Sequence, residues 1–244
     1  MATVFTDTVL PETSGVNEDL NLGTVGDSVT LPTGVTLKTN KIFDAGGNNV
    51  ITSDGSGSLT VNAGMAGDIA LISTQTADDS STIDFTTGID STYGVYIFKW
   101  LGIVPATDGA YGQVVFGTTG PSWGITKITT TWSCGNSEND SNSGPSYQTD
   151  TDNANNSDPA YVTREIGSYT AENANLELWL FKPWATDYNK QMWARSSIYQ
   201  YSNYAEGDFL GGWLKTNSAI TAVRFQLSSG NMDSGKIKMY GLKI

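Results

Sequence analysis

Apolar side chains recur at alternate positions through most of this chain, and this period of two constrains the fold more than any other feature. Gly-, Asn- and Asp-rich turns separate the segments, and none sustains the i, i+3, i+4, i+7 spacing of an amphipathic helix. We therefore predict an all-β protein whose C-terminal part is an antiparallel, jelly-roll-like β-sandwich. The expected strands are 69–75, 82–86, 94–104, 112–117, 124–134, 175–182, 190–202, 208–215, 219–229 and 235–244.

The last two segments show the alternation most clearly. Val223, Phe225 and Leu227 alternate with Arg and Gln, and Ile237 and Met239 alternate with lysines. A strand with one apolar and one polar side has one buried and one solvent-exposed face. We expect these two segments to form a hairpin whose final strand closes the fold.

The composition of the chain changes near residue 68. All seven tryptophans follow residue 99, whereas the earlier part is rich in Gly, Thr, Ser, Asn and Asp. Between residues 27 and 62 its apolar residues lie in five-residue pieces such as 27–31 and 35–39, which turn signals separate. We predict two domains, an N-terminal anchor or stalk of short strands over 1–68 and a sandwich head over 69–244.

The short N-terminal pieces have thin apolar edges, which bury too little surface to offset roughly 1–2 kcal/mol of backbone entropy per ordered residue. Three outcomes remain open for this region: partial disorder, packing against another protein, or pairing with copies of itself around a symmetry axis. We favour the last, which predicts a homotrimer.

Charge and cysteine content exclude several partners and settings. The net charge is −12 and there is no histidine; a field of this sign repels phosphate backbones, so we expect no nucleic acid partner. The single cysteine, Cys134, precludes an intrachain disulfide and fits assembly in a reducing cytosol. The first residues do not resemble a secretory signal, and no apolar run is long enough for membrane insertion.

Three stretches resemble pieces of bacteriophage structural proteins, particularly those of phages of marine bacteria. They are STQTADDSSTIDFTTGIDSTYGVYIFKWLGIVPATDGA, TNSAITAVRFQLSSGNMDSGKIKMYGLKI and NKIFDAGGNNVITSDGSGSLTVN. The Ser-Gly-x-Ile-x-Met-Tyr-Gly ending resembles the last strand of a sandwich carried by tail fibres or capsid-surface proteins. The resemblance implies a protein of the virion exterior, assembled in the host cytoplasm and joined to other virion proteins through its N-terminal region.

These observations favour a structural and attachment role over catalysis. The first hypothesis is a trimeric, fibre-like appendage that contacts the host surface. The second is a capsid decoration protein that stabilises the head, and the third, less favoured, is a polysaccharide-degrading spike enzyme.

No catalytic, cofactor or metal residue is assigned. Nucleophilic triads of the usual kind need a base that this chain lacks, and Cys134 is interpreted as a small core residue. The remaining acidic residues of the second region carry no signature and are interpreted as solvated surface: Glu165, Glu172, Glu177, Asp187 and Asp208.

The segment 135–161 is rich in oxygen ligands and is expected to be a long loop. Asp150-Thr151-Asp152 begins like a calcium loop, but Ala154 breaks the pattern and no glycine follows in sixth place. We therefore predict a surface loop without metal.

The candidate contact surface lies in the segment 190–202. If Met192, Ala194 and Ile198 point inward, the alternate positions carry three aromatic residues and an arginine, which suit a contact surface. Three interpretations stay open: burial within the chain, contact with another subunit, or binding of a host glycan. The four candidate residues are Trp193, Arg195, Tyr199 and Tyr201.

Overall fold

The computed structural model describes residues 41–43, 49–53, 55–56, 59–61, 68–169 and 171–243. The chain divides into two units, Met1–Met65 and Ala66–Ile244. Every regular element among the described residues is a β-strand, and these residues contain no helix. The all-β prediction is therefore confirmed.

The first unit contains one small antiparallel sheet. Its three strands are β1 (Lys41–Phe43), β2 (Asn49–Ser53) and β3 (Leu59–Val61), with β2 in the middle. Short strands were expected here, but the pieces at 27–31 and 35–39 lie outside the described residues. The pairing of this region with further copies stays a prediction.

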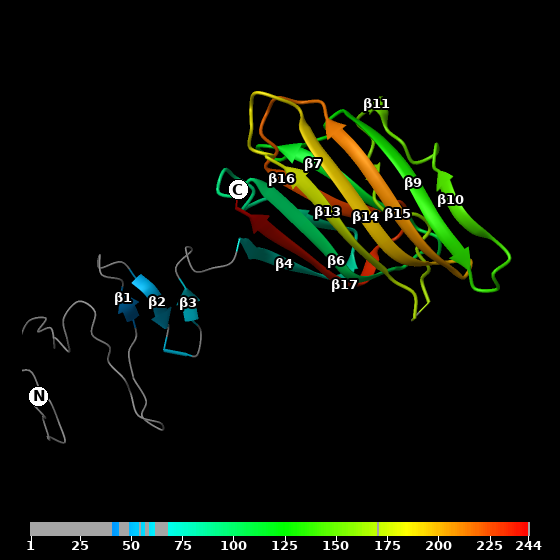
Figure 1. Cartoon of the computed structure of the whole chain (residues 1–244), viewed down its shortest axis with the longest axis horizontal. Coiled ribbons are helices and arrows are strands. Elements are labelled where there is room, and N and C mark those ends of the chain that lie inside the picture. The colour runs from blue at the N-terminus through cyan, green and yellow to red at the C-terminus, as the bar shows by residue number, and fades with distance from the viewer. Residues whose placement is uncertain are drawn as a thin grey trace, which may run out of the picture. The chain divides into compact units, whose positions relative to one another are not determined.

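The second unit is dominated by a large antiparallel sheet, which faces the viewer in Figure 1. Strand β11 (Ala154–Asn156) pairs with β9 beside the main path. The main path runs through β10 (Ser143–Tyr147), β9 (Lys127–Ser137), β15 (Tyr204–Leu214), β14 (Lys190–Gln200), β13 (Ala174–Phe181), β6 (Val95–Pro105), β17 (Met232–Leu242) and β4 (Ile69–Ser80).

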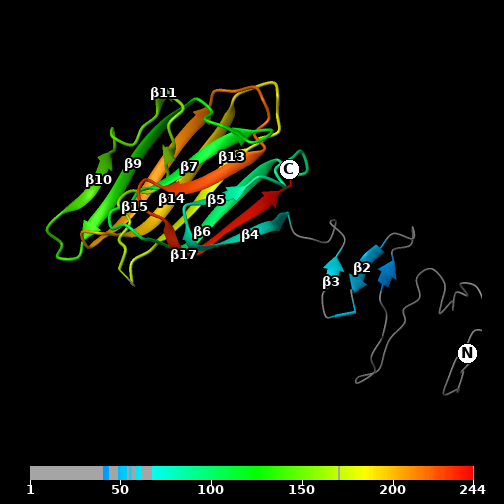
Figure 2. The same cartoon turned by 180° about the vertical axis from the view of Figure 1, so that it is seen from behind.

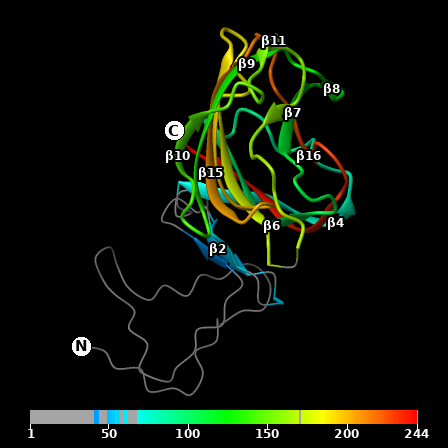
Figure 3. The same cartoon turned by 90° about the vertical axis from the view of Figure 1, so that its right-hand side faces the viewer.

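A smaller antiparallel sheet lies behind the large one. Its strands, in spatial order, are β12 (Ala160–Tyr161), β7 (Gly112–Thr118), β16 (Ala222–Leu227) and β5 (Thr82–Phe85), and β8 (Ser122–Trp123) pairs with β7. Figure 2 shows this sheet from its own side, and Figure 3 shows the two sheets as separate layers. The second unit is therefore a β-sandwich.

The strands pair in a nested order that gives the sandwich a jelly-roll-like connectivity. In the large sheet β4 pairs with β17 and β6 with β13; in the small sheet β5 pairs with β16 and β7 with β12. First strands thus meet last strands, and the chain crosses between the layers repeatedly, as in a long hairpin rolled onto itself. Strands β9, β10, β14 and β15 extend the large sheet beyond this nested set.

The core between the sheets is built from side chains at alternate positions. Phe98 and Trp100 of β6 meet Phe225 of β16 edge to face, with ring centroids 5.4 and 5.6 Å apart. Phe85 of β5 contacts Phe98 in the same way, at 5.3 Å. These four rings are at most 2% exposed. Burial of this kind stabilises a fold by about 25 cal/mol for each Å² of apolar surface removed from water.

The hairpin expected for the last two segments is wrong, although the alternation within each segment is confirmed. Strand β16 belongs to the small sheet and β17 to the large one, where β17 pairs with β4 and β6. Val223, Phe225, Ile237 and Met239 are all fully buried because the two strands face each other across the core. Alternation identifies the buried face of a strand but not its hydrogen-bonded neighbour.

All ten expected strands of the second region occur, with ends that differ by a few residues. The single long loop expected over 135–161 is wrong, because β10, β11 and β12 lie within it. These strands have two to five residues and little apolar content, which leaves no alternation to detect.

Candidate functional site

Strand β14 places three of the four predicted contact residues on its outer face, as the alternation of its side chains predicted. Met192, Ala194 and Ile198 are 2–4% exposed and face the small sheet. Trp193 is half-buried on the opposite, outer face of the large sheet, and Arg195 and Tyr199 are exposed there.

Tyr201 does not share this surface. It lies past the end of β14, in the turn to β15, where its backbone N–H donates to the carbonyl oxygen of Glu165. Its ring lies beside Gly109, in the loop before β7. The structure therefore brings three of the four predicted residues onto one strand face and separates the fourth.

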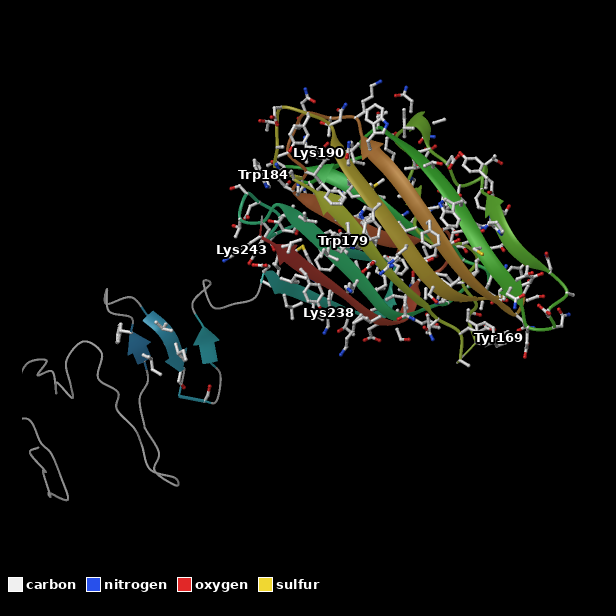
Figure 4. The ribbon with its side chains drawn as sticks, viewed as in Figure 1. Tyr169, Trp179, Trp184, Lys190, Lys238 and Lys243 are labelled. Carbon is white, nitrogen blue, oxygen red and sulfur yellow. The ribbon has the colours of Figure 1, made fainter. Side chains whose placement is uncertain are left out.

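Neighbouring strands add aromatic side chains that the sequence prediction missed. Trp179 of β13 lies opposite Trp193, and their rings stack with centroids 5.2 Å apart at 14°. Phe209 of β15 lies opposite Trp132 of β9, and these rings stack at 4.2 Å and 8°. We call the outer surface of these strands the aromatic face; its large rings are Trp132, Trp179, Phe181, Trp193, Phe209 and Trp213. Figure 4 shows Trp179 on this face.

A hollow of about 500 Å³ lies in the aromatic face where a strand lacks side chains. Gly211 of β15 sits between Trp193 and Thr130 in the cross-strand register. The walls of the hollow include Trp193, Trp213 and Phe181. A methyl group on Gly211 would meet only Thr130, at an ordinary 3.7 Å, so the space above this glycine is open.

A row of charged side chains crosses the same face beside the stacked tryptophans. Arg195, Glu177, Lys99 and Lys238 lie opposite one another on the successive strands β14, β13, β6 and β17. Glu177 accepts from Arg195 Nε at 2.5 Å and pairs with Lys99 Nζ at 3.4 Å. We call these four residues the charged row.

A separate polar cleft of about 330 Å³ lies where the large sheet extends past the small one. The segment 148–165 covers the inner face of β9 and β15 here, and Gln148 donates to Ser133 of β9. Arg164 is central: its backbone N–H donates to Asp208 at 3.0 Å, its Nη1 lies 3.4 Å from Asp150, and its Nε lies 4.0 Å from Glu206.

Burial of carboxylates beside this cleft perturbs their protonation. Burial, with a smaller contribution from the charge of Glu206, raises the pKa of Asp208 from 3.8 to about 6, against hydrogen bonds from Arg164 and Ser196 that lower it. Burial also raises the pKa of Glu206. Oδ1 of Asp208 has no hydrogen-bond partner among the described residues. The cleft is a polar pocket whose lining includes Arg164, Glu165 and Glu206.

Two of the acidic residues interpreted as solvated surface are buried, which corrects that interpretation. Asp208 is 1% exposed, because β15 turns its polar side toward the cleft. Glu172 is 5% exposed and accepts from the N–H of Tyr169 at 3.0 Å. Its carboxyl group occupies the space beside Gly167 that a β-carbon would need, so a side chain at that glycine would displace it.

The interpretation of Cys134 as a core residue is also wrong. It is exposed on the outer face, two residues along β9 from Trp132 and opposite Gly207. Thr131 and Ser133 take the inward positions instead because this part of the large sheet covers the polar cleft rather than the apolar core.

Two carboxylates of the segment 135–161 are engaged by the protein itself. One oxygen of Asp152 accepts from the N–H of Thr131 at 2.8 Å, and the other accepts from the hydroxyl of Tyr147. Asp150 pairs with Arg164. Among the described residues, no three His, Cys, Asp or Glu side chains gather in a way that would hold a metal ion.

Comparisons with known proteins add no relative. Within the described ranges there is no helix with the length and apolar character needed to cross a membrane. No protein-family model matches the chain, and no curated protein is similar to it.

Proposed function

We propose that this chain is an exposed, homotrimeric, fibre-like appendage of a bacteriophage particle, and that its aromatic face binds carbohydrate on the host surface. The observation that carries the proposal is a set of six partly exposed rings on four neighbouring strands, four of which form two stacked pairs. The likeness of three sequence stretches to bacteriophage structural proteins supports the setting.

The paired rings suit a flat, weakly polar ligand such as a sugar. In a stacked pair each ring covers only one face of its partner, so the other face of Trp132 and of Trp193 is not used by that pair. An aromatic ring offers a large contact area at low cost in side-chain entropy. Polar groups at the rim of the hollow, Gln191 and Thr130, supply the few directional contacts that ligand sites need.

Neither the small sheet nor the 148–165 segment covers the aromatic face. The small sheet and the 148–165 segment cover the inner side of the large sheet, whereas Trp132 is 43% exposed and Tyr147, opposite it on β10, is 57% exposed. Exposed aromatic side chains that lie next to one another support a contact role for this face.

The proposal is tested with the full chain and a set of matched variants. We expect Trp132→Ala and Trp193→Ala each to lower binding to host cells, and to glycans extracted from the host envelope, by at least tenfold. The reason is that a ligand ring stacked on an aromatic side chain contributes about 1–3 kcal/mol where nucleic acid bases are the ligand. Tyr169→Ala removes an aromatic side chain that is 69% exposed in a loop away from this face, and it should bind normally.

Oligomeric state separates attachment from subunit contact. Sedimentation of the same variants should show an unchanged oligomer. If Trp193→Ala instead dissociates the oligomer and leaves adsorption per subunit intact, the aromatic face is an interface between subunits and the proposal is wrong.

A further inference from the structure

We infer that the aromatic face recognises an acidic polysaccharide, whose carboxylate or sulfate groups lie along the charged row while its sugar rings lie over the neighbouring tryptophans. This inference rests on the proposed function and names the class of its ligand. It is carried by the distribution of charge on the face and by the cross-strand register.

Positive charge gathers on this face although the chain as a whole is strongly acidic. The outward positions of β9, β15, β14, β13 and β6, together with those of β17 from Lys236 onward, carry four cations and one carboxylate. The carboxylate is Glu177, and the cations are Arg195, Lys99, Lys236 and Lys238. The chain has 13 basic and 25 acidic residues in all, so this local excess opposes the overall charge of −12.

The single carboxylate does not neutralise the row. Glu177 is held between Arg195 and Lys99, at 2.5 and 3.4 Å, and its side chain is only 13% exposed. Arg195 and Lys99 keep 61% and 46% of their side-chain surface in solvent. Glu177 therefore fixes the two cations in place, and both retain N–H groups for an outside anion, the kind of charge-assisted contact that carboxylates and sulfates make best.

Asp78, on the neighbouring strand β4, is an acidic residue whose place along the sheet the register gives. Asp78 pairs with Ser234 in the β4–β17 ladder, four residues along β17 from Lys238, about 13 Å away at 3.3 Å for each residue. At physiological ionic strength charges separated by more than about 8 Å are largely screened at a protein surface. A polyanion at the charged row therefore experiences mainly the local cations.

The register sets the charged row directly beside an apolar one. Moving two residues along each strand leads from Arg195, Glu177, Lys99 and Lys238 to Trp193, Trp179, Ile97 and Tyr240. Two residues span about 7 Å along a strand. A chain lying across the strands would thus have a cationic edge on one side and an aromatic edge on the other, which fits a polymer with apolar ring faces and regularly spaced anionic groups.

The test compares an acidic polymer with its own neutral form. The probes are polygalacturonate, alginate and chondroitin sulfate, each paired with a methyl-esterified or desulfated version of the same backbone. We expect the intact chain to bind at least one acidic polymer about tenfold more tightly than its neutral form. Lys99→Gln combined with Lys238→Gln should abolish this preference while leaving binding of the neutral form unchanged.

A charge-matched control separates local from global charge. Lys215 lies past the end of β15, about 20 Å along the sheet from Phe209, which is opposite Arg195. Lys215→Gln removes one positive charge, as Lys99→Gln or Lys238→Gln alone does, and should keep the preference. If neutral forms bind as well as acidic ones, the inference fails and the proposed function stands. If no polymer binds and Trp193→Ala leaves adsorption to host cells intact, both fail.

Discussion

The large sheet carries aromatic rings on both faces, and the two sets are packed differently. On the inner face, Phe98 and Trp100 contact Phe225 of the other sheet edge to face and are almost completely buried. On the outer face, Trp132 stacks on Phe209 and Trp179 on Trp193, and each pair joins adjacent strands of one sheet.

From this difference we expect stability to depend on the inner rings and the proposed recognition to depend on the outer ones. Inner contacts connect two sheets whose described strands share no hydrogen-bonded ladder, so the sandwich depends on these contacts. Outer pairs connect strands that the backbone ladder already holds, so their loss leaves the sheet paired. The outer rings are therefore the ones free to serve a ligand, and the predictions below test this separation from the largest expected effect to the smallest.

The largest effect is expected at the centre of the inner set. Phe225→Ala removes a ring that contacts Phe85, Phe98 and Trp100 and leaves a cavity between the sheets. Large-to-small changes of this kind cost about 3–5 kcal/mol. Urea unfolding followed by circular dichroism measures the loss, and a cost below about 1 kcal/mol would show that the layers are not held together in this way.

A smaller effect, dependent on pH, is expected at the inner face of β15. The pKa of Asp208 is about 6 in the folded domain and 3.8 as a reference, so the folded state keeps the proton to higher pH. Its contribution to stability is present below about pH 4 and is lost as the pH rises through 6, a difference on the order of 3 kcal/mol.

Asp208→Asn removes this ionisation. The variant should gain stability relative to the parent chain between pH 4 and pH 7, by an amount approaching that difference. Asp140→Asn is the control, since Asp140 is exposed in a turn with φ 55°, a conformation that asparagine tolerates. Parallel pH profiles for Asp208→Asn and the parent chain would show that burial of this carboxylate does not control its protonation.

Local alternation predicted the buried faces of β14, β16 and β17, but the side chains assigned in β9 and β15 were placed wrongly. In β14 the apolar residues face the core, and the outward positions predicted for Trp193 and Arg195 are confirmed. In β9 and β15 the polar residues Thr131, Ser133 and Asp208 point inward, because there the inner face borders a polar cleft. The usual rule of apolar residues inside therefore misassigned Cys134 and Asp208.

The set of residues that forms the candidate site could not be predicted from the sequence for a second reason. Trp132 and Phe209 are 77 residues apart in the chain, and only the strand register brings their rings together. Strand order across a sandwich depends on long-range packing, which no local period encodes. The same limit explains why the hairpin predicted for β16 and β17 is wrong. Both strands show the same alternation, but they belong to different sheets.

The smallest effect on stability is expected at the outer pair. Phe209→Ala removes the ring that stacks on Trp132, and an aromatic pair contributes about 0.5–1.5 kcal/mol beyond the area it buries. Because Phe209 keeps its backbone pairing with both β9 and β14, the cost should stay near the upper end of that range, well below that of Phe225→Ala. A cost equal to that of Phe225→Ala would mean that the outer rings also support the fold, and the separation between stability and recognition would fail.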